Sequence, residues 1–251
     1  MIESASGETF TKHIKKLFGQ LGLENTYLDE NEPIIPGRSR YYQRDKDHKL
    51  QNVPCVNNSM KWAGGGFLST VGDLLQFGNA MLYSYQKAEA AEEEIKTKQV
   101  VYRASPFSAI NNNPESAVAL PPVLKPGTMK MLWTPMIKTS KDGDGFYGLG
   151  WAVTEEKTDY AYAKKHRFYA AHSGGAVGAS SILLVYPRKK EADLGSSNEH
   201  LPQGVVVAII CNMQNTSVSK VALNVAKIFE NLPVNSDGYK VRKIVQCSSE
   251  V

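Results

Sequence analysis

Apolar residues recur at helical spacing in three segments of the chain. The first predicts a helix that Gly22 ends, and the second predicts about three turns after Thr70, which with Asp73 resembles a capping box. The third predicts a helix that begins near Ser217. The apolar sides of these helices consist, in order, of Phe10, Ile14, Leu17, Phe18 and Leu21; of Val71, Leu74, Leu75, Gly78, Met81 and Leu82; and of Val218, Val221, Ala222, Val225, Ile228 and Phe229.

Four runs in the second half of the chain have the length and composition of strands. They are Phe146–Thr154, Arg167–His172, Ala179–Tyr186 and Gly204–Asn212. Short polar or charged segments join them, as in an antiparallel meander. A helix packed across such a meander predicts an α+β fold, in which helices flank an antiparallel sheet.

The remaining segments predict turns and surface structure. Arg40–Gln43 and Leu50–Val53 flank a polar turn at residues 45–48 and predict a β-hairpin. Residues 86–122 are acidic at first and then rich in Asn, Pro and Ser, which indicates a surface insertion. The residues after Pro233 predict a loose tail.

Composition excludes several classes of function. Hydrophobic residues make up 42% and charged residues 22% of 251 residues, which is typical of a soluble globular protein. A net charge of +4, in short clusters without stacking aromatics, argues against nucleic acid as a partner. The histidines and cysteines lack metal-site spacing, so no metal or other cofactor is expected. No apolar run approaches the ~18 residues of a transmembrane helix. The first residues lack the features of a targeting signal.

The sequence His172-Ser173-Gly174-Gly175, at the end of a predicted strand, is the sharpest candidate for chemistry. Small residues let a substrate approach the strand edge, and exposed N–H groups there can hydrogen-bond a developing oxyanion. An imidazole beside them can donate a proton or hold a carboxylate. A tight glycine turn beside a satisfied core histidine explains the same residues. A dinucleotide-binding loop is excluded, because the next segment predicts a strand instead of a helix.

A serine nucleophile is not evident. Gly-x-Ser-x-Gly is absent, and Ser-x-x-Lys occurs at Ser84–Lys87 and Ser217–Lys220. This spacing puts both side chains on one helix face, where a neutral lysine can take the proton of the serine. Ser84 is expected at the frayed end of its helix, beside acidic residues that keep Lys87 charged, and Ser217 is expected to cap the last helix. We therefore reject both serines as nucleophiles.

Six blocks of sequence are more specific than any of these short motifs. They are residues 5–10 (ASGETF), 21–23 (LGL), 57–75 (NNSMKWAGGGFLSTVGDLL), 147–151 (YGLGW), 172–181 (HSGGAVGASS) and 209–213 (IICNM). Together they resemble the penicillin-binding protein and serine β-lactamase superfamily. The resemblance is strongest to the class C and esterase-like branch and, within it, to the mitochondrial serine β-lactamase-like proteins of animals.

This resemblance implies an αβα sandwich of the β-lactamase and transpeptidase type, with three active-site motifs. The motifs are Ser-x-x-Lys, a tyrosine motif, and Lys-Thr-Gly or His-Thr-Gly on an edge strand. His172-Ser173-Gly174 resembles the third motif with Ser in place of Thr, and Gly175 would supply an oxyanion N–H. The first two motifs have no counterpart here. Residues 1–251 are therefore expected to be the C-terminal portion of one such domain, incomplete at the N-terminus.

The leading hypothesis is that the chain is part of a serine hydrolase that acts on a small-molecule or peptide substrate. Such an enzyme would cleave an amide, peptide or ester through a covalent acyl-enzyme. The chain alone is expected to be inactive, because nucleophile and base supply most of an acyl-transfer rate. The alternative is a non-catalytic pseudo-enzyme that binds or assembles, and a homo-oligomer is left open. A third hypothesis is that the chain does not fold stably alone. A mitochondrial location rests on the resemblance only.

Overall fold

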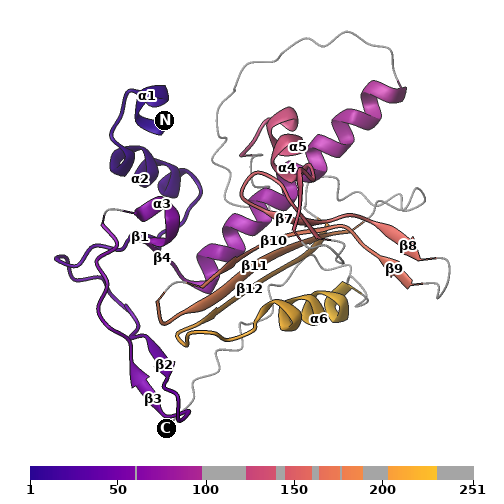
Figure 1. Ribbon diagram of the computed structural model, residues 1–251. Helices are drawn as coiled ribbons and strands as arrows, with labels where there is room; N and C mark the ends of the chain where they lie inside the picture. Colours follow the sequence, from indigo (N-terminus) through magenta and orange to yellow (C-terminus); the bar gives the residue numbers. More distant parts are fainter. Residues whose placement is uncertain are drawn as a thin grey trace, which may run out of the picture.

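The computed structural model describes residues 1–59, 61–97, 123–139, 145–159, 164–175, 177–188 and 203–230. Its centre is a six-stranded antiparallel sheet in the order β12-β11-β10-β7-β6-β5 (Figure 1). The strands are β5 (Ile137–Lys138), β6 (Gly145–Tyr147), β7 (Ala152–Thr154), β10 (Tyr169–Gly174), β11 (Ser180–Pro187) and β12 (Gly204–Cys211).

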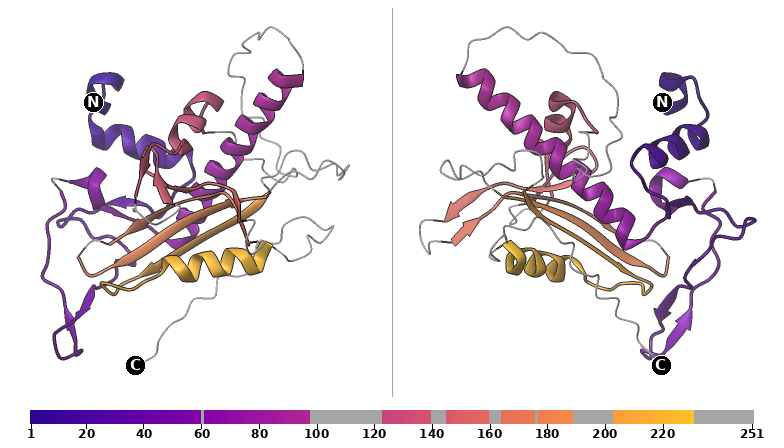
Figure 2. Two further views of the ribbon diagram at one scale, coloured as in Figure 1. Left: turned by 45° about the vertical axis from the view of Figure 1, so that its right-hand side comes forward. Right: turned by 180° about the vertical axis from the view of Figure 1, so that it is seen from behind.

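Helices cover both faces of this sheet. The helices α4 (Val71–Thr97) and α5 (Pro126–Trp133) lie on one face, and α6 (Ser219–Glu230) lies on the other (Figures 1 and 2). The side chains of successive strand residues point alternately to the two faces of the sheet. In β11, for example, Leu183 and Val185 pack with α4 and α5, whereas Ile182 and Leu184 pack with α6. The predicted α+β fold, with helices flanking an antiparallel sheet, is confirmed.

The sheet differs from the predicted meander in two strands. The segment predicted as one strand, Phe146–Thr154, forms both β6 and β7, because residues 148–151 make a tight turn. In this turn Gly148 N–H donates to the Trp151 carbonyl at 2.8 Å, and Gly150 has a φ of 77°. The strand β10 continues beyond its predicted end at His172 as far as Gly174. Residues 172–174 are therefore strand residues instead of a turn.

The helices on the sheet also differ in length and exposure from the prediction. The helix α4 has 27 residues instead of about three turns, and it runs through the first part of the predicted insertion. Its apolar contact continues that far, since Ala88 is buried in the core. Residues 98–122 of that insertion and the tail after Pro233 lie outside the described residues. On α6, Val221, Ile228 and Phe229 were predicted to be buried but are exposed.

The N-terminal part, residues 1–68, lies at one end of the sheet (Figure 1). It contains α1 (Ile2–Ser6), α2 (Phe10–Gln20), α3 (Trp62–Gly65), the pair β1 (Tyr27–Leu28) and β4 (Phe67–Leu68), and the hairpin β2 (Tyr42–Arg44) and β3 (Leu50–Asn52). The first predicted helix is present as α2, which ends at Gln20, two residues before Gly22, and the predicted hairpin is present as β2 and β3. Elsewhere β8 (Lys157–Asp159) pairs with β9 (Lys164–His166), which the sequence did not predict.

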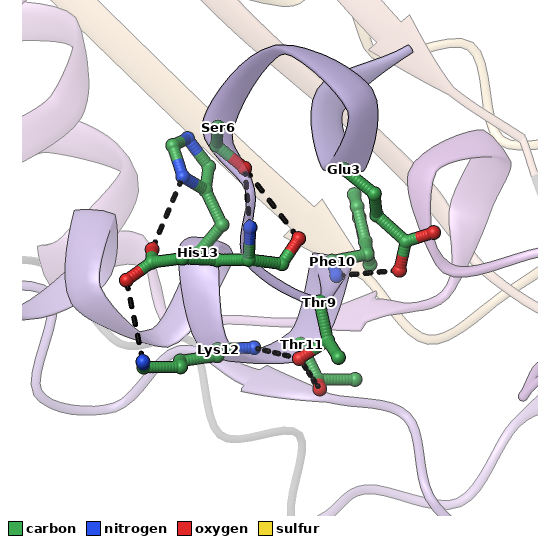
Figure 3. Close-up of polar contacts among 8 residues, drawn as sticks. Glu3, Ser6, Thr9, Phe10, Thr11, Lys12 and His13 are labelled. Carbon is green, nitrogen blue, oxygen red and sulfur yellow. Dashed lines mark hydrogen bonds and ion pairs between the residues drawn. The ribbon is translucent and has the colours of Figure 1, made fainter.

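Side-chain hydrogen bonds fix the first two helices (Figure 3). Glu3 Oε1 accepts from Phe10 N–H at 2.8 Å, and Thr9 Oγ1 caps α2 by accepting from Lys12 N–H at 3.4 Å. Such contacts satisfy N–H groups that a helix start leaves without intrahelical partners. The aromatic ring of Phe10 then stacks near Trp62 of α3, with centroids 6.4 Å apart.

Candidate active site

The candidate site lies where β10 extends past its neighbour in the sheet. On one side, β10 pairs with β11 along its length, through to Gly174 opposite Ser181. On the other side, its pairing with β7 ends at Ala171 opposite Ala152. The segment before β7 turns away from β10 at this point, because the Trp151 carbonyl accepts from Gly148 N–H in the β6–β7 turn. Within the described residues, no strand pairs with His172–Gly174 on that side, so part of their backbone N–H and C=O groups faces an open edge.

The side chains of His172 and Ser173 are both exposed and point to opposite faces of the sheet. His172 pairs with Leu183, which packs on the α4 face, and Ser173 pairs with Ile182, which packs on the α6 face. The interpretation of His172 as a core histidine is wrong, because its ring is exposed. Its ring lies edge-on to that of Tyr147, with centroids 6.3 Å apart. Tyr147 was not predicted as part of this site.

The two glycines that follow have different surroundings. A methyl group on Gly174 would overlap the Ser181 hydroxyl oxygen, so packing between β10 and β11 accounts for this glycine. A methyl group on Gly175 would meet nothing within 4 Å. Packing does not account for Gly175, and space remains there for another molecule.

The Ser84 hydroxyl is unsuited to attack a substrate. Ser84 is 1% exposed, donates to the Ala80 carbonyl at 2.8 Å and accepts from Val123 N–H at 3.0 Å. Lys87 is exposed, with its ammonium group 5.3 Å from the centroid of the Tyr83 ring. The reason given above for rejecting Ser84 is wrong in one respect, since Ser84 lies in the body of α4 and not at a frayed end.

Ser217 does not hold the expected cap position. The helix α6 begins at Ser219, two residues later, and its first described turn contains the bond from Ala222 N–H to the Val218 carbonyl. Ser217 is exposed in the preceding segment.

Among the residues that the structure describes, no group of three His, Cys, Asp or Glu side chains could hold a metal ion, and no helix is long and apolar enough to cross a membrane. A shallow hollow of about 240 Å³ is lined by Phe10, Ser59, Lys61, Trp62, Ala63 and Gly64. Another, of about 320 Å³, is lined by Glu3, Gly7, Glu8 and Thr9. Neither includes residues 172–175.

A family model described as "Beta-lactamase" matches residues 1–229. The chain belongs to the β-lactamase family. This β-lactamase-family chain is 45% identical over 232 residues to "Serine beta-lactamase-like protein LACTB, mitochondrial" of Bos taurus. It is 44% identical over 232 residues to the proteins of the same name from Mus musculus and Homo sapiens. Each alignment covers 92% of this chain and 38% of the relative. The resemblance found in the six sequence blocks is thus confirmed, and the chain spans well under half the length of these curated relatives.

A solved structure described as a penicillin binding protein from Bacillus halodurans shares the fold of this β-lactamase-family chain. The two have a TM-score of 0.52 and 14% sequence identity, over 91% of this chain and 52% of that one. At this low identity the likeness shows the fold alone, and it agrees with the αβα sandwich that the resemblance implies.

Proposed function

We propose that residues 172–175 form one wall of the active site of a serine hydrolase that cleaves an amide, peptide or ester through a covalent acyl-enzyme. The open edge of β10 at His172–Gly174 is the observation that carries this proposal. A substrate backbone can lie along such an edge as an added strand. Its reacting carbonyl then comes close to N–H groups that stabilise the negative charge of the tetrahedral intermediate.

Each residue has a role that fits its position. His172, on the α4 face, holds a substrate carboxylate or assists proton transfer, as an exposed imidazole can. Gly175 N–H donates to the oxyanion, and the open space beside Gly175 admits the substrate. The side chain of Ser173 is on the opposite face of the sheet, so Ser173 would contact the substrate only at the open edge of β10. Nucleophile and base come from a Ser-x-x-Lys motif that precedes these residues in a longer form of the protein. The reaction needs no cofactor.

Transcripts sequenced through their 5′ ends test the first part of this proposal. A coding sequence upstream of Met1 should contain Ser-x-x-Lys, and the longer product should react covalently with a fluorescent fluorophosphonate. His172→Ala should slow this acylation about 100-fold, the effect of removing a general acid–base group. His13→Ala, at a partly exposed histidine on α2, should leave the rate unchanged. If no transcript encodes the motif, or if both variants react at the same rate, the proposal is wrong.

A non-catalytic binding or assembly protein is the second candidate for the 251-residue chain itself. The buried, doubly hydrogen-bonded hydroxyl of Ser84 favours it. The purified chain should remain unlabelled by the fluorophosphonate at concentrations that label an ordinary serine hydrolase. Covalent labelling of this chain would contradict this candidate. Light scattering then tests whether the chain forms a homo-oligomer.

A mitochondrial location is part of the same proposal. It is supported by the names of the three relatives, each of which is described as mitochondrial. Cell fractionation with an antibody against this chain is expected to place the longer product with mitochondrial markers. A purely cytosolic distribution would contradict it.

A further inference from the structure

Gly178, in the described part of the connection between β10 and β11 (residues 175 and 177–179), is held by a side chain far away in sequence. Gly178 N–H donates to Gln214 Oε1 at 2.9 Å. The backbone of Gln214 is itself fixed, because its N–H donates to the Tyr42 carbonyl at 2.9 Å. Tyr42 N–H in turn donates to the Asn212 carbonyl at 3.0 Å. One glutamine therefore connects Gly178 to a short parallel bridge between Tyr42 of the hairpin and Met213, two residues after β12.

The residues that flank the hairpin pack directly on the same turn. Gly178 is buried with a φ of 84°, and a methyl group there would overlap Tyr41 Cβ and Val53 Cγ2. Tyr41 and Val53 are joined by the bond from Val53 N–H to the Tyr41 carbonyl at 3.2 Å. Burial, and then the negative charge of Asp29, raises the pKa of the Tyr41 phenol, while the nearby Arg38 lowers it.

Both supports of the turn are anchored elsewhere. The Ser180 hydroxyl, 5% exposed, donates to the Met213 carbonyl at 2.9 Å and accepts from Thr216 N–H at 3.0 Å, which fixes the segment that carries Gln214. On the hairpin side, Arg38 lies three residues before Tyr41 and forms an ion pair with the buried Asp29. Gly178 thus lies between two segments, each of which has polar contacts of its own to other parts of the chain.

We infer that Gln214 is a positioning residue of the proposed active site: through Gly178 it fixes the turn that carries the Gly175 N–H. This inference rests on the proposed function. An oxyanion donor acts only within about 2.7–3.1 Å of the developing charge, and a misplacement of about 1 Å can cost 100-fold in rate. Gly175 has open space where a side chain would be, so its place depends on contacts made by its neighbours in the chain.

Hydrogen–deuterium exchange of the 251-residue chain tests this inference without turnover. Gln214→Met keeps the length of the side chain but removes the acceptor for Gly178 N–H. Exchange in the peptide covering residues 172–179 should become about ten-fold faster, as expected for one lost hydrogen bond, while α4 and β11 keep their protection. Gln214→Glu retains a carboxylate oxygen as acceptor and should restore slow exchange. Unchanged exchange in Gln214→Met, or no rescue by Gln214→Glu, overturns the inference.

A pair of glycine variants gives a second measurement with a matched control. Gly178→Ala should accelerate exchange in the same peptide, because its methyl group meets Tyr41 and Val53. Gly37→Ala introduces the same residue at a φ of 70° with nothing within 4 Å, and should leave this peptide protected. Equal effects of the two variants overturn the inference. A missing upstream Ser-x-x-Lys would overturn only the proposed function, because exchange does not depend on catalysis.

Discussion

The central sandwich and the N-terminal part of the molecule are stabilised by different kinds of contact. Among the described residues, the buried apolar side chains before residue 69 are Ile14, Leu21, Leu23 and Leu28, and all others belong to the sandwich. The N-terminal part has a small apolar cluster, in which Leu21 and Leu23 pack with Ala80 of α4, and adds buried carboxylates to it. Asp29 accepts from Arg38 and Asn58, and Asp73 of α4 accepts from Asn25 N–H and the Thr26 hydroxyl. Apolar packing therefore stabilises the central sandwich, and polar contacts fix the position of the N-terminal loops relative to it.

The largest expected effect comes from the core of the sandwich. Leu184→Ala removes a side chain that is 1% exposed between β11 and α6, and should cost about 2–5 kcal/mol in the free energy of unfolding. Leu50→Ala in β3, at a residue 56% exposed, should cost less than about 0.5 kcal/mol. Urea unfolding of both variants measures the difference. Equal costs would show that the hairpin is covered in solution and that Leu50 contributes to stability as a core residue does.

The N-terminal part should also respond to the loss of a buried charge. Asp29→Ala removes the acceptor of Arg38 Nη2 and of the Asn58 amide, although Arg38 Nη1 still donates to the Glu30 carbonyl, and should cost about 2 kcal/mol. The double variant Asp29→Ala/Arg38→Met should recover part of this, because the unpaired cation is then absent. Urea unfolding in a double-mutant cycle gives the coupling. If the costs of the two substitutions are purely additive, the Asp29–Arg38 ion pair contributes nothing to the stability of the N-terminal part.

The same contrast explains how much of the fold the sequence predicted. Hydrophobic periodicity correctly placed α2, α4, α6, β11 and β12, although half of the predicted apolar side of α6 is exposed. It missed the break between β6 and β7, because Gly148 and Gly150 turn the chain within an apolar run. It also missed α5, which begins with a proline and has only two buried side chains, Met129 and Trp133. Local patterns do not encode contacts between distant segments.

The site was predictable only in part for the same reason. Residues 172–175 could be identified from their small side chains, one histidine and a family resemblance. The open edge of β10 could not, because it depends on where a separate strand, β7, ends. Tyr147 comes close to His172 through the register of the sheet. Gln214 comes close to the site because the bridge between Tyr42 and Met213 positions the segment that carries it. Only the YGLGW block containing Tyr147 gave a signal, and it could not indicate a contact with His172.

A smaller effect is expected at the buried hydroxyl of Ser84. Ser84→Ala removes the acceptor for Val123 N–H and should cost about 1–2 kcal/mol in thermal or urea unfolding. Ser217→Ala, at an exposed residue before α6, should change stability by less than about 0.5 kcal/mol. If Ser84→Ala leaves stability unchanged, the sandwich does not depend on this polar contact, and Ser84 would again have to be considered for chemistry.

The smallest effect should come from the outer side of α6, where the sandwich itself exposes apolar residues. Val221 is 53% exposed and the neighbouring Ala222 is fully buried against the sheet. Val221→Lys should therefore change the free energy of unfolding by less than about 0.5 kcal/mol, because the lysine remains in water. Ala222→Lys forces a charge into the core and should prevent stable folding. A large cost for Val221→Lys that depends on protein concentration would mean that another copy of the chain covers α6, and the sandwich would then owe part of its stability to association.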